Sequence, residues 1–384
     1  MTEFVAQTLT SGGIEAVLAY YQPYSISPEL SVPAFCLAHR RVKSREERIG
    51  DRRRHAIGAW LPELEFTHYL PTKHWKALIE DCDVHLSVSG NCLAATPFAM
   101  LNIPYWAWIA TPWQEDREQR AQRYSPPRKL LDRWINTHGV RRLQRKVLDN
   151  GTIVALSEYT RERLARLTSR KRQIDVMPMA IDTDLFKPNR TRDSSGRRIG
   201  FVGRLTDPRK NVALLLSTTA WCRENGAPDL ELVLIGESDP ALHDAIRGHG
   251  LQDSVVLVED IDNTYLPAYL NTLDLFVIPS HQEGLCIAAL EAMSCGVPVV
   301  STPCGGPREF VLDDETGIVT DGNAEALGRA ILQALNTPNL RSRFSRNARR
   351  LIETRYSVDA VGKEFWYLFE KTFANTAGKD AQPN

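Results

Sequence analysis

The 384-residue sequence lacks a net charge, because 47 Lys and Arg residues balance 47 Asp and Glu residues. It also lacks the cysteine spacing of a disulfide framework or a zinc site, since its seven cysteines are scattered without a C-x-x-C pair. The first residues, MTEFVAQTLTSGG, show no basic stretch followed by an apolar one, so we expect no secretory signal. These absences favour a reduced, cytoplasmic compartment. The length and the 43% hydrophobic content suit two globular domains.

Long uninterrupted apolar runs are absent as well. The strongest candidate for a membrane segment, Pro97–Trp113, is short for a span and contains three prolines. Two interpretations fit it: a buried strand with turns at both ends, which we favour, or a patch at a membrane interface.

The two halves of the chain differ in charge although the total is zero. Residues 1–190 carry 28 basic and 21 acidic residues, and residues 191–384 carry 19 and 26. Much of the basic excess lies in His39–His55 and Arg141–Lys146. Such a face is either simply solvated or turned toward anionic lipid headgroups or an anionic substrate. The second interpretation predicts peripheral contact with an anionic membrane at its inner face; we expect no nucleic-acid partner.

Short apolar runs alternate with helical patterns along most of the chain, which is typical of α/β domains with parallel sheets. The predicted strands are FVAQTL (4–9), VHLSV, TIVAL, RIGFVG, LELVLIG, SVVLV, LDLFVIP and VPVVS. Asn211–Glu224, Ala241–Gly248 and Leu285–Cys295 are predicted helices.

The segment Asp182–Arg198 is rich in charge and turn-forming residues and resembles a linker. We therefore predict two domains joined near residues 186–197, the first covering residues 1–190 and the second residues 191–356. An amphipathic helix at residues 357–375 has no strand after it, and we expect it to pack back across the first domain and complete it.

Two glutamates, Glu283 and Glu291, interrupt the apolar stretch SHQEGLCIAALEAMSCGVPVV. A helix should begin near Gly284 or Leu285 and end at Gly296. In an open parallel sheet this junction lies at the carboxyl edge where ligands bind, and the first amides of the helix would face a bound anion such as phosphate.

Two interpretations of the glutamates remain open on spacing alone. Both carboxylates accept hydrogen bonds from hydroxyl groups, Glu283 from a sugar and Glu291 from the two ribose hydroxyls of a nucleotide. Alternatively, Glu283 is an acid placed favourably at the start of a helix, and Glu291 pairs with a basic residue.

The segment GFVGRLTDPRKN favours the first interpretation. Arg204 and Lys210 follow a predicted strand, at the edge where the glutamates are expected. Either cation alone would be an ordinary solvated residue. Together, the two cations would stabilise a diphosphate leaving group.

With these motifs in place, the second half resembles the family 4 (group 1) retaining glycosyltransferases of the GT-B fold. GRLTDPRKN, followed by PSHQEGLCIAALEAMSCGVPVVSTPCGGPRE, is similar to the family pattern G-R-L…K, then P-S…E-G-F-G-L-x-x-L-E-A-M-A-C-G-x-P-V-V…G-G-x-x-E. TSGGIE, ALSEYTRERL and VMPMAIDTDLFKP are similar to first-domain elements of the family, less closely. The resemblance implies two Rossmann-like domains facing each other across a donor-binding cleft.

The resemblance also implies residue roles. Glu283 would contact the donor sugar, Glu291 the ribose, and Arg204 and Lys210 the donor diphosphate. The loop residues Gly284, Leu285, Cys286 and Ile287 would bind the donor, with the amides of the last two on phosphate. Gly12 and Gly13 would form the glycine loop that faces the donor phosphates and the acceptor.

The sequence departs from the family pattern at three places. Cys286 replaces a glycine that usually lets the backbone approach phosphate. One extra residue in RLTDPRKN makes Arg209 an alternative to Lys210, which we favour because it adjoins the helix start. Ala110 stands where many relatives carry a histidine near the reacting sugar.

Other residues could take the place of the histidine that is absent at Ala110. The segment Trp113–Asp116 follows Ala110 and would rebuild that wall of the site, while His85 and His138, the other sources of an imidazole, are expected to be structural or solvated. Gly305 and Gly306 predict a tight loop near the nucleotide, and Glu309 is expected to cap or orient a following helix.

The resemblance implies an enzyme that moves a sugar from a nucleoside diphosphate sugar, expected to be a UDP- or GDP-sugar, to a hydroxyl acceptor. Retention of anomeric configuration and independence of metals and other cofactors are implied as well. We expect a role in glycan, polysaccharide or glycolipid synthesis, with a glycan or lipid-linked acceptor. The alternatives are a nucleotide-sugar-binding protein without transferase activity, motivated by Ala110, and a hydrolysing epimerase or phosphorylase of the same fold.

Overall fold

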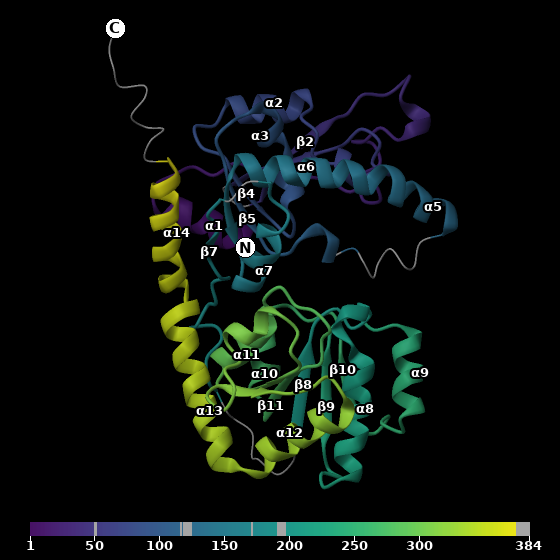
Figure 1. Cartoon of the computed structure of the whole chain (residues 1–384), viewed down its shortest axis with the longest axis vertical. Helices are drawn as coiled ribbons and strands as arrows, with labels where there is room; N and C mark the ends of the chain where they lie inside the picture. The colour runs from purple at the N-terminus through teal and green to yellow at the C-terminus, as the bar shows by residue number, and fades with distance from the viewer. Residues whose placement is uncertain (50–51, 116, 118–124, 170–171, 190–196, 374–384) are drawn as a thin grey trace. The chain divides into compact units, whose positions relative to one another are not determined.

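The computed structural model describes residues 1–384 apart from residues 50–51, 116, 118–124, 170–171, 190–196 and 374–384 (Figure 1). The contacts between residues divide the chain into two compact units. The first unit consists of Met1–Met177 together with the segment that starts at Glu364, and the second unit is Pro178–Lys363. Both units combine helices with mainly parallel strands, which confirms the predicted α/β class.

The first unit ends earlier than the predicted boundary after residue 190. The residues from Pro178 onward belong to the second unit because they pack against its helices. The guanidinium of Arg349, on α13 (Pro338–Leu351), donates hydrogen bonds of 2.7 Å to the carbonyl oxygens of Phe186 and Ser294. The predicted linker at residues 186–197 thus begins inside the second unit, and residues 190–196 lie outside the described residues.

Among the residues described for the second unit, six parallel strands form one sheet in the order β10-β9-β8-β11-β12-β13. Most residues of the central strands are buried, which is why these strands occur as continuous apolar runs. Five of them confirm predicted strands; β13 is short and includes a glycine, so it forms no apolar run. The strands are β8 (Arg198–Val202), β9 (Glu231–Ile235), β10 (Val255–Val258), β11 (Leu275–Ile278), β12 (Val299–Ser301) and β13 (Gly317–Val319).

Helices pack against this sheet and against one another (Figure 1). Gly328 on α12 leaves room for the ring of Trp221 on α8, because a Cβ at Gly328 would lie 2.3 Å from that ring. The three helices predicted here are confirmed as α8, α9 and α11. The helices are α8 (Val212–Glu224), α9 (Pro240–Gly248), α10 (Leu266–Leu270), α11 (Ile287–Ser294), α12 (Ala324–Asn336), α13, and α14 (Val358–Phe373), which continues into the first unit.

The described strands of the first unit form two sheets. One has the order β1-β3-β2 and the other the order β4-β5-β6-β7. All pairs are parallel except β2 with β3. The strands are β1 (Leu18–Tyr21), β2 (Ser44–Ile49), β3 (Arg52–Ile57), β4 (Leu86–Ser89), β5 (Trp106–Ile109), β6 (Thr152–Ala155) and β7 (Asp175–Val176). The helices described here are α1 (Thr2–Ser11), α2 (Lys73–Glu80), α3 (Thr96–Leu101), α5 (Pro126–Leu131), α6 (Thr137–Asn150) and α7 (Glu158–Ala165).

The apolar segment Pro97–Trp113 contains a buried strand, as favoured from the sequence. All four residues of β5 are buried, and the residues before them form α3 and a turn. In the described part of the chain, no helix is both long enough and apolar enough to cross a membrane.

The predicted strand at residues 4–9 is wrong, because these residues lie in α1. The helix buries an apolar face that includes Val5 and Leu9, which are one helical turn apart. An apolar run this short does not distinguish a strand from a helix, and the helical spacing is the better guide here.

Gly12 and Gly13 consequently end a helix rather than follow a strand. The amide of Gly12 donates to the carbonyl oxygen of Thr8, the amide of Ile14 to that of Leu9, and Gly13 has a φ of +78°. This is the pattern of a helix terminated by glycine. Such an end presents carbonyl oxygens, which repel phosphate. The prediction that Gly12 and Gly13 form a loop facing the donor phosphates rested on a strand before them, and the structure has a helix there.

The second half of α14 completes the core of the first unit, beginning at Glu364. The ring centroid of Phe365 lies 5.2 Å from that of Trp106 and 6.4 Å from that of Phe4. Trp366 lies against Gly12, where a Cβ would approach the indole ring to 2.4 Å. Gly12 thus makes room for an aromatic side chain.

We expect Gly12→Ala to lower the free energy of unfolding by about 1–3 kcal/mol, because the added methyl group overlaps the Trp366 ring. Gly362→Ala on α14, the helix that carries Trp366, is the control: a Cβ there meets nothing within 4 Å, so α14 should become slightly more stable. Urea unfolding measures both. Equal stability of Gly12→Ala and the unchanged chain would contradict this packing.

Candidate functional site

The sheet of the second unit reverses its strand order beside β8. From β8 the chain adds β9 and β10 on one side, and it then returns to place β11 on the other side of β8. The two strands are paired in parallel, Leu275 with Ile199 and Phe276 with Gly200. Their carboxyl ends therefore lie next to each other, and a parallel sheet binds ligands at such a reversal point.

Lys210 and Glu283 meet at this point. Lys210 follows β8 and Glu283 follows β11, and the Lys210 Nζ donates hydrogen bonds to both carboxylate oxygens of Glu283, at 2.7 and 2.8 Å. The Ser280 hydroxyl donates a third, of 2.7 Å, to Oε1. Glu283 is only 5% exposed, so its charge depends on these partners. Two residues predicted for the site are thus brought together, and the structure adds an ion pair between them that the sequence did not predict.

The other two cations of this loop differ in exposure. Arg204 has a side chain that is 66% exposed, and one of its nitrogens lies 3.2 Å from Asp207. The Arg209 guanidinium is buried and donates hydrogen bonds to both oxygens of Asp207. Burial acts to raise the pKa of Asp207, but the hydrogen bonds and charge of Arg209 outweigh it and hold that pKa below its ordinary value. Arg209 is thus bound to Asp207 just as Lys210 is bound to Glu283, and the choice of Lys210 as the second cation stays a prediction.

The loop that contains Glu283 is joined to the loop after β12. The Glu283 amide donates to the carbonyl oxygen of Cys304, and the Gly306 amide donates to that of Glu283. A Cβ at Gly306 would lie 2.0 Å from the Gly284 carbonyl oxygen, so only glycine permits this approach. The predicted tight loop is present. Glu309 is the last residue of a short helix (Gly306–Glu309), and its expected role in capping or orienting a following helix stays a prediction.

Cys286 takes up a backbone conformation that glycine normally adopts. Its φ is +68° and its ψ is 73°, and it immediately precedes α11, which begins at Ile287, slightly later than predicted. A residue with a Cβ in this region costs about 1–2 kcal/mol. Burial raises the pKa of the Cys286 thiol well above its ordinary value, so this side chain stays neutral beside the helix terminus. Cys286 therefore has the backbone conformation expected of the glycine in the family pattern, and it differs from that glycine by a small neutral side chain.

The first turn of α11 supplies amides without acceptors inside the helix. Cys286 and Ile287 occupy its start, and Leu285 before them is buried. A helix N-terminus with its partial positive charge binds phosphate groups well. Among the described residues this terminus adjoins the loop that carries Glu283. The amides that open α11, the Lys210 ammonium and the Arg204 guanidinium therefore belong to loops at one edge of the sheet.

Glu291 lies on α11 and is half-buried. Burial raises the pKa of its carboxyl from 4.5 to about 7. In the described part of the chain, the structure records no hydrogen bond or ion pair to this carboxylate. The interpretation that Glu291 pairs with a basic residue is therefore not supported, and its oxygens remain available to hydroxyl groups of a ligand.

Ala110, where many relatives carry a histidine, and the residues after it form hydrogen bonds with other residues of the first unit. Ala110 directly follows β5, and its carbonyl oxygen accepts a hydrogen bond from the Thr160 hydroxyl. Trp113 is buried and donates from Nε1 to Glu65 at 2.6 Å. Gln114 bonds to Gln144 at 3.1 Å.

The other residues considered as substitutes for this histidine are hydrogen-bonded, exposed or outside the described residues. Glu115 accepts from Tyr159 and pairs with Arg163, and Asp116 lies outside the described residues. His85 lies 3.0 Å from the Ile79 carbonyl oxygen, as expected of a structural residue, and His138 is exposed.

Ser280 and Asn211 are residues of the candidate site that sequence reasoning missed. Ser280 donates to Glu283, and the Asn211 side-chain amide donates to the Pro279 carbonyl oxygen at 3.2 Å, which joins the two loops. A serine three residues before a glutamate was the available signal for the first. The side-chain contact of Asn211 has no sequence signal.

The comparisons with known proteins agree with this geometry. Residues 182–351 match the family described as "Glycosyl transferases group 1". The matched residues make up most of the second unit. The group 1 segment contains every predicted site residue except Gly12 and Gly13.

Curated proteins to which the chain is similar include two mannosyltransferases of Mycolicibacterium species. A GDP-mannose-dependent alpha-(1-6)-phosphatidylinositol monomannoside mannosyltransferase of Mycolicibacterium smegmatis is 33% identical over 210 residues, which are 50% of this chain and 54% of that protein. The MMP alpha-(1->4)-mannosyltransferase of Mycolicibacterium hassiacum is 27% identical over 73% of this chain and 68% of that protein. The match to the first of these relatives thus spans about half of its length.

Solved structures show that the fold is the GT-B type. Sucrose-phosphate synthase from Thermosynechococcus elongatus superimposes with a TM-score of 0.73 at 20% identity, covering 97% of this chain and 93% of that one. Anabaena HepE, solved with UDP and glucose, gives a TM-score of 0.62 at 18% identity over 77% and 81% of the two chains. At these identities the likeness concerns the fold alone.

Glu291 should make the stability of the chain depend on pH. Between about pH 4.5 and about pH 7 the folded chain keeps a proton that the unfolded chain has lost, so stability falls as the pH rises through this window. Glu291→Gln keeps the shape of the side chain and should remove this part of the slope.

Urea unfolding across the same window measures the effect, with Glu315→Gln at an exposed position as the matched control. The stability of Glu291→Gln relative to the unchanged chain should increase with pH, whereas that of Glu315→Gln should stay constant. A constant difference for both variants would show that Glu291 titrates normally.

Proposed function

We propose that the chain is a glycosyltransferase that moves a sugar from a nucleoside diphosphate sugar to a hydroxyl acceptor. The observation that carries the proposal is the set of groups at the reversal point: Lys210 on buried Glu283, exposed Arg204, the amides that open α11, and the unpaired Glu291. Cations and amides suit a diphosphate, and a half-buried carboxylate without a partner suits a pair of hydroxyl groups.

Lys210 and Arg204 would stabilise the departing diphosphate. When the bond between the sugar C1 and the diphosphate oxygen breaks, negative charge grows on that oxygen, and fixed cations lower the energy of this state. Ser280 and Glu283 hold the Lys210 ammonium in place before the reaction begins. The acceptor position of Glu283 that remains after these three bonds, on Oε2, would face a hydroxyl of the sugar.

We further propose that the reaction retains the anomeric configuration and needs no metal. The acceptor oxygen would bond to C1 on the face from which the diphosphate leaves, and the acceptor proton would pass to a diphosphate oxygen. This route uses no protein base, which suits a chain with Ala110 where a histidine is common in relatives. The two cations would supply the positive charge that a metal ion provides elsewhere.

A GDP- or UDP-sugar is the proposed donor. The mycobacterial relative that is 33% identical is named as GDP-mannose-dependent, and Anabaena HepE was solved with UDP. The name of the same relative includes a phosphatidylinositol mannoside, which supports a lipid-linked or glycan acceptor.

Lys210→Met should reduce turnover by about 10²–10³-fold, because it removes a cation that acts on the leaving group. It should also lower stability by about 3–5 kcal/mol, since Glu283 is left buried without its cation. The double variant Lys210→Met with Glu283→Gln separates the two effects: it should regain most of the stability and none of the turnover.

The assay follows nucleoside diphosphate release from GDP-mannose and UDP-glucose with a panel of hydroxyl acceptors, with and without EDTA, and the anomeric configuration of the product by NMR. The exposed residue Lys187 provides the control variant Lys187→Met. Turnover that survives in the folded double variant would exclude the proposed role of Lys210.

We also propose that the first unit contacts an anionic membrane, through a different basic surface from the run His39–His55. Several arginines in His39–His55 have acidic partners: Arg45 pairs with Glu47, and Arg52 pairs with Glu3. That run is therefore partly neutralised and a weaker candidate than the sequence suggested.

The helical segment from α5 to α6 is the better candidate. Leu130 and Trp134 are 61% and 64% exposed there, and Arg141, Arg142 and Arg145 are exposed with no ion pair recorded among the described residues. The three arginines line a cavity of about 540 Å³ together with Lys146. Exposed apolar side chains beside unpaired cations are typical of a helix that lies on an anionic bilayer.

Replacing Arg141, Arg142 and Arg145 together by Gln should weaken binding to phosphatidylglycerol vesicles on the order of 100-fold at low salt, since each basic residue near the surface contributes about 1 kcal/mol. Trp134→Ala should weaken it as well, and Arg45→Gln is the matched control. Cosedimentation measures the binding. Equal binding of the triple variant and the unchanged chain would exclude this surface.

A further inference from the structure

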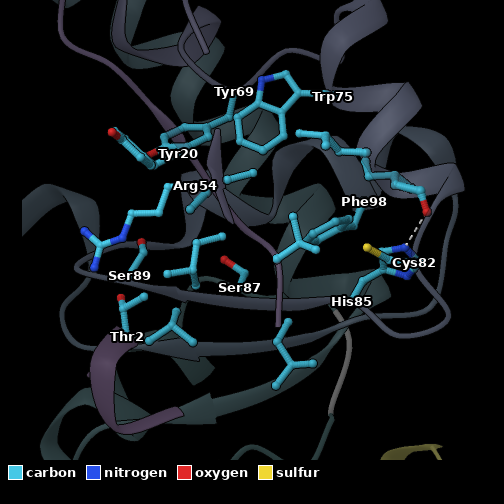
Figure 2. A pocket seen from close by; sticks show the side chains of 18 of the residues that line it. Thr2, Tyr20, Arg54, Tyr69, Trp75, Cys82, His85, Ser87, Ser89 and Phe98 are labelled. Carbon is cyan, nitrogen blue, oxygen red and sulfur yellow. Dashed lines mark hydrogen bonds between the residues drawn. The ribbon is translucent and has the colours of Figure 1, made fainter. Parts of the chain in front are cut away.

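Among the described strands of the first unit, two have open edges that line the same cavity. β1 is the last strand of the three-stranded sheet, and β4 is the last strand of the four-stranded sheet. Leu18–Tyr20 of β1 and Leu86–Ser89 of β4 line a cavity of about 670 Å³. Figure 2 shows the labelled side chains around it, with Tyr20 at the top of the view and Ser87 and Ser89 below.

The backbone of β1 alternates between its partner β3 and the cavity. The amide of Gln22 donates to the Ile57 carbonyl oxygen, so in this parallel ladder Leu18 and Tyr20 also bond toward β3. The amide and carbonyl groups of Ala19 therefore point away from β3, toward the open edge.

β4 shows the same alternation. The Trp106 amide donates to the His85 carbonyl oxygen and the Ala110 amide to that of Ser89, so Ser87 and Ser89 bond toward β5. The backbone groups of Leu86 and Val88 point the other way, and the structure records no hydrogen bond for them among the described residues. Two rows of backbone donors and acceptors thus border one cavity.

The cavity wall is mainly apolar above and below these edges. Leu78, Ile79, Phe98 and Trp75 contribute to it, and Trp75 and Ile79 are buried. A strand in the middle of a sheet has apolar side chains on both faces, because helices cover both. The edges and the wall together therefore have the hydrogen-bonding and apolar character that a central strand requires.

We propose that an extended peptide segment of about four to six residues, with apolar side chains on both faces, inserts between β1 and β4. It would pair with Ala19 on one side and with Leu86 and Val88 on the other, and so join the two sheets into one. The proposed interface continues two existing ladders, β3-β1 and β4-β5. Strand addition to open edges is a common mode of peptide binding. This inference concerns the first unit and goes beyond the proposed transfer reaction.

A small polar molecule is the other occupant of suitable size. The Nε of Arg54 and the Nε1 of Trp75 are buried near this cavity without a hydrogen-bond partner. Such a ligand would bond to these two side chains and leave the open backbone groups of both strands unpaired. The strand accounts for the backbone groups on both edges, and for this reason we favour it.

The test joins a probe strand to the full chain. Thr2 lines the cavity, so a segment Val-Ile-Val-Val-Val attached ahead of it through a flexible Gly-Ser linker would be held at millimolar effective concentration. The control extension carries Pro at the second and fourth positions, which removes amide donors and prevents strand pairing.

The strand extension should raise Tm by at least about 5 °C above the control extension. It should also slow amide hydrogen exchange at Ala19, Leu86 and Val88 at least tenfold, whereas the amides of Tyr20 and Ser87, already bonded in the ladders, should change little. Equal Tm and equal exchange in the two extensions would overturn the proposal.

Ala19→Pro provides a second test within the chain. It removes a donor that faces the cavity while leaving the bonds from Tyr20 to β3, and an edge strand tolerates such a proline. The difference between the two extensions should largely disappear in this variant. The chain without an extension gives a further control. If its amides at Ala19, Leu86 and Val88 exchange hydrogen more slowly as the protein concentration rises, a second copy of the chain occupies the cavity, and this would also overturn the proposal.

Discussion

The buried ion pair between Lys210 and Glu283 is the interaction on which the site depends. A carboxylate that is 5% exposed cannot remain charged without close partners, and the Lys210 ammonium supplies the opposite charge. The two residues follow different strands, so the pair also holds the carboxyl ends of β8 and β11 in a defined relation. Ser280 and the contacts of the Glu283 backbone with Cys304 and Gly306 extend this constraint into the neighbouring loops.

Most of the second unit could be predicted from the sequence. Its central strands are buried on both faces and stand out as apolar runs, and the charged residues between them fall at the loops after β8 and β11. The first unit was less predictable for a physical reason. The run at residues 4–9 is short enough to suit either a strand or a helix, and its misassignment placed Gly12 and Gly13 in the wrong kind of turn. Nothing in the sequence indicates that the first-unit strands divide into two sheets.

The environment of individual side chains was the least predictable part of the site. The sequence predicts both Glu283 and Glu291 as acceptors for ligand hydroxyl groups, yet one is buried in an ion pair and the other is half-buried without a recorded partner in the described chain. The positive φ of Cys286 has no sequence signal unless the residue is compared with the glycine of similar proteins. These differences arise from the packing of loops that are distant in the sequence, which local patterns do not encode.

The central claim is that the reversal point of the second unit binds the diphosphate and ribose of a nucleoside diphosphate sugar. Titration calorimetry of GDP, UDP and their sugars into the full chain tests it most directly, with inorganic phosphate as the reference ligand. The account predicts saturable one-to-one binding of at least one nucleotide. It also predicts at least about tenfold weaker affinity when Glu291 is replaced by Gln, because the ribose loses its acceptor. No nucleotide binding, or equal affinity in the two proteins, would contradict it.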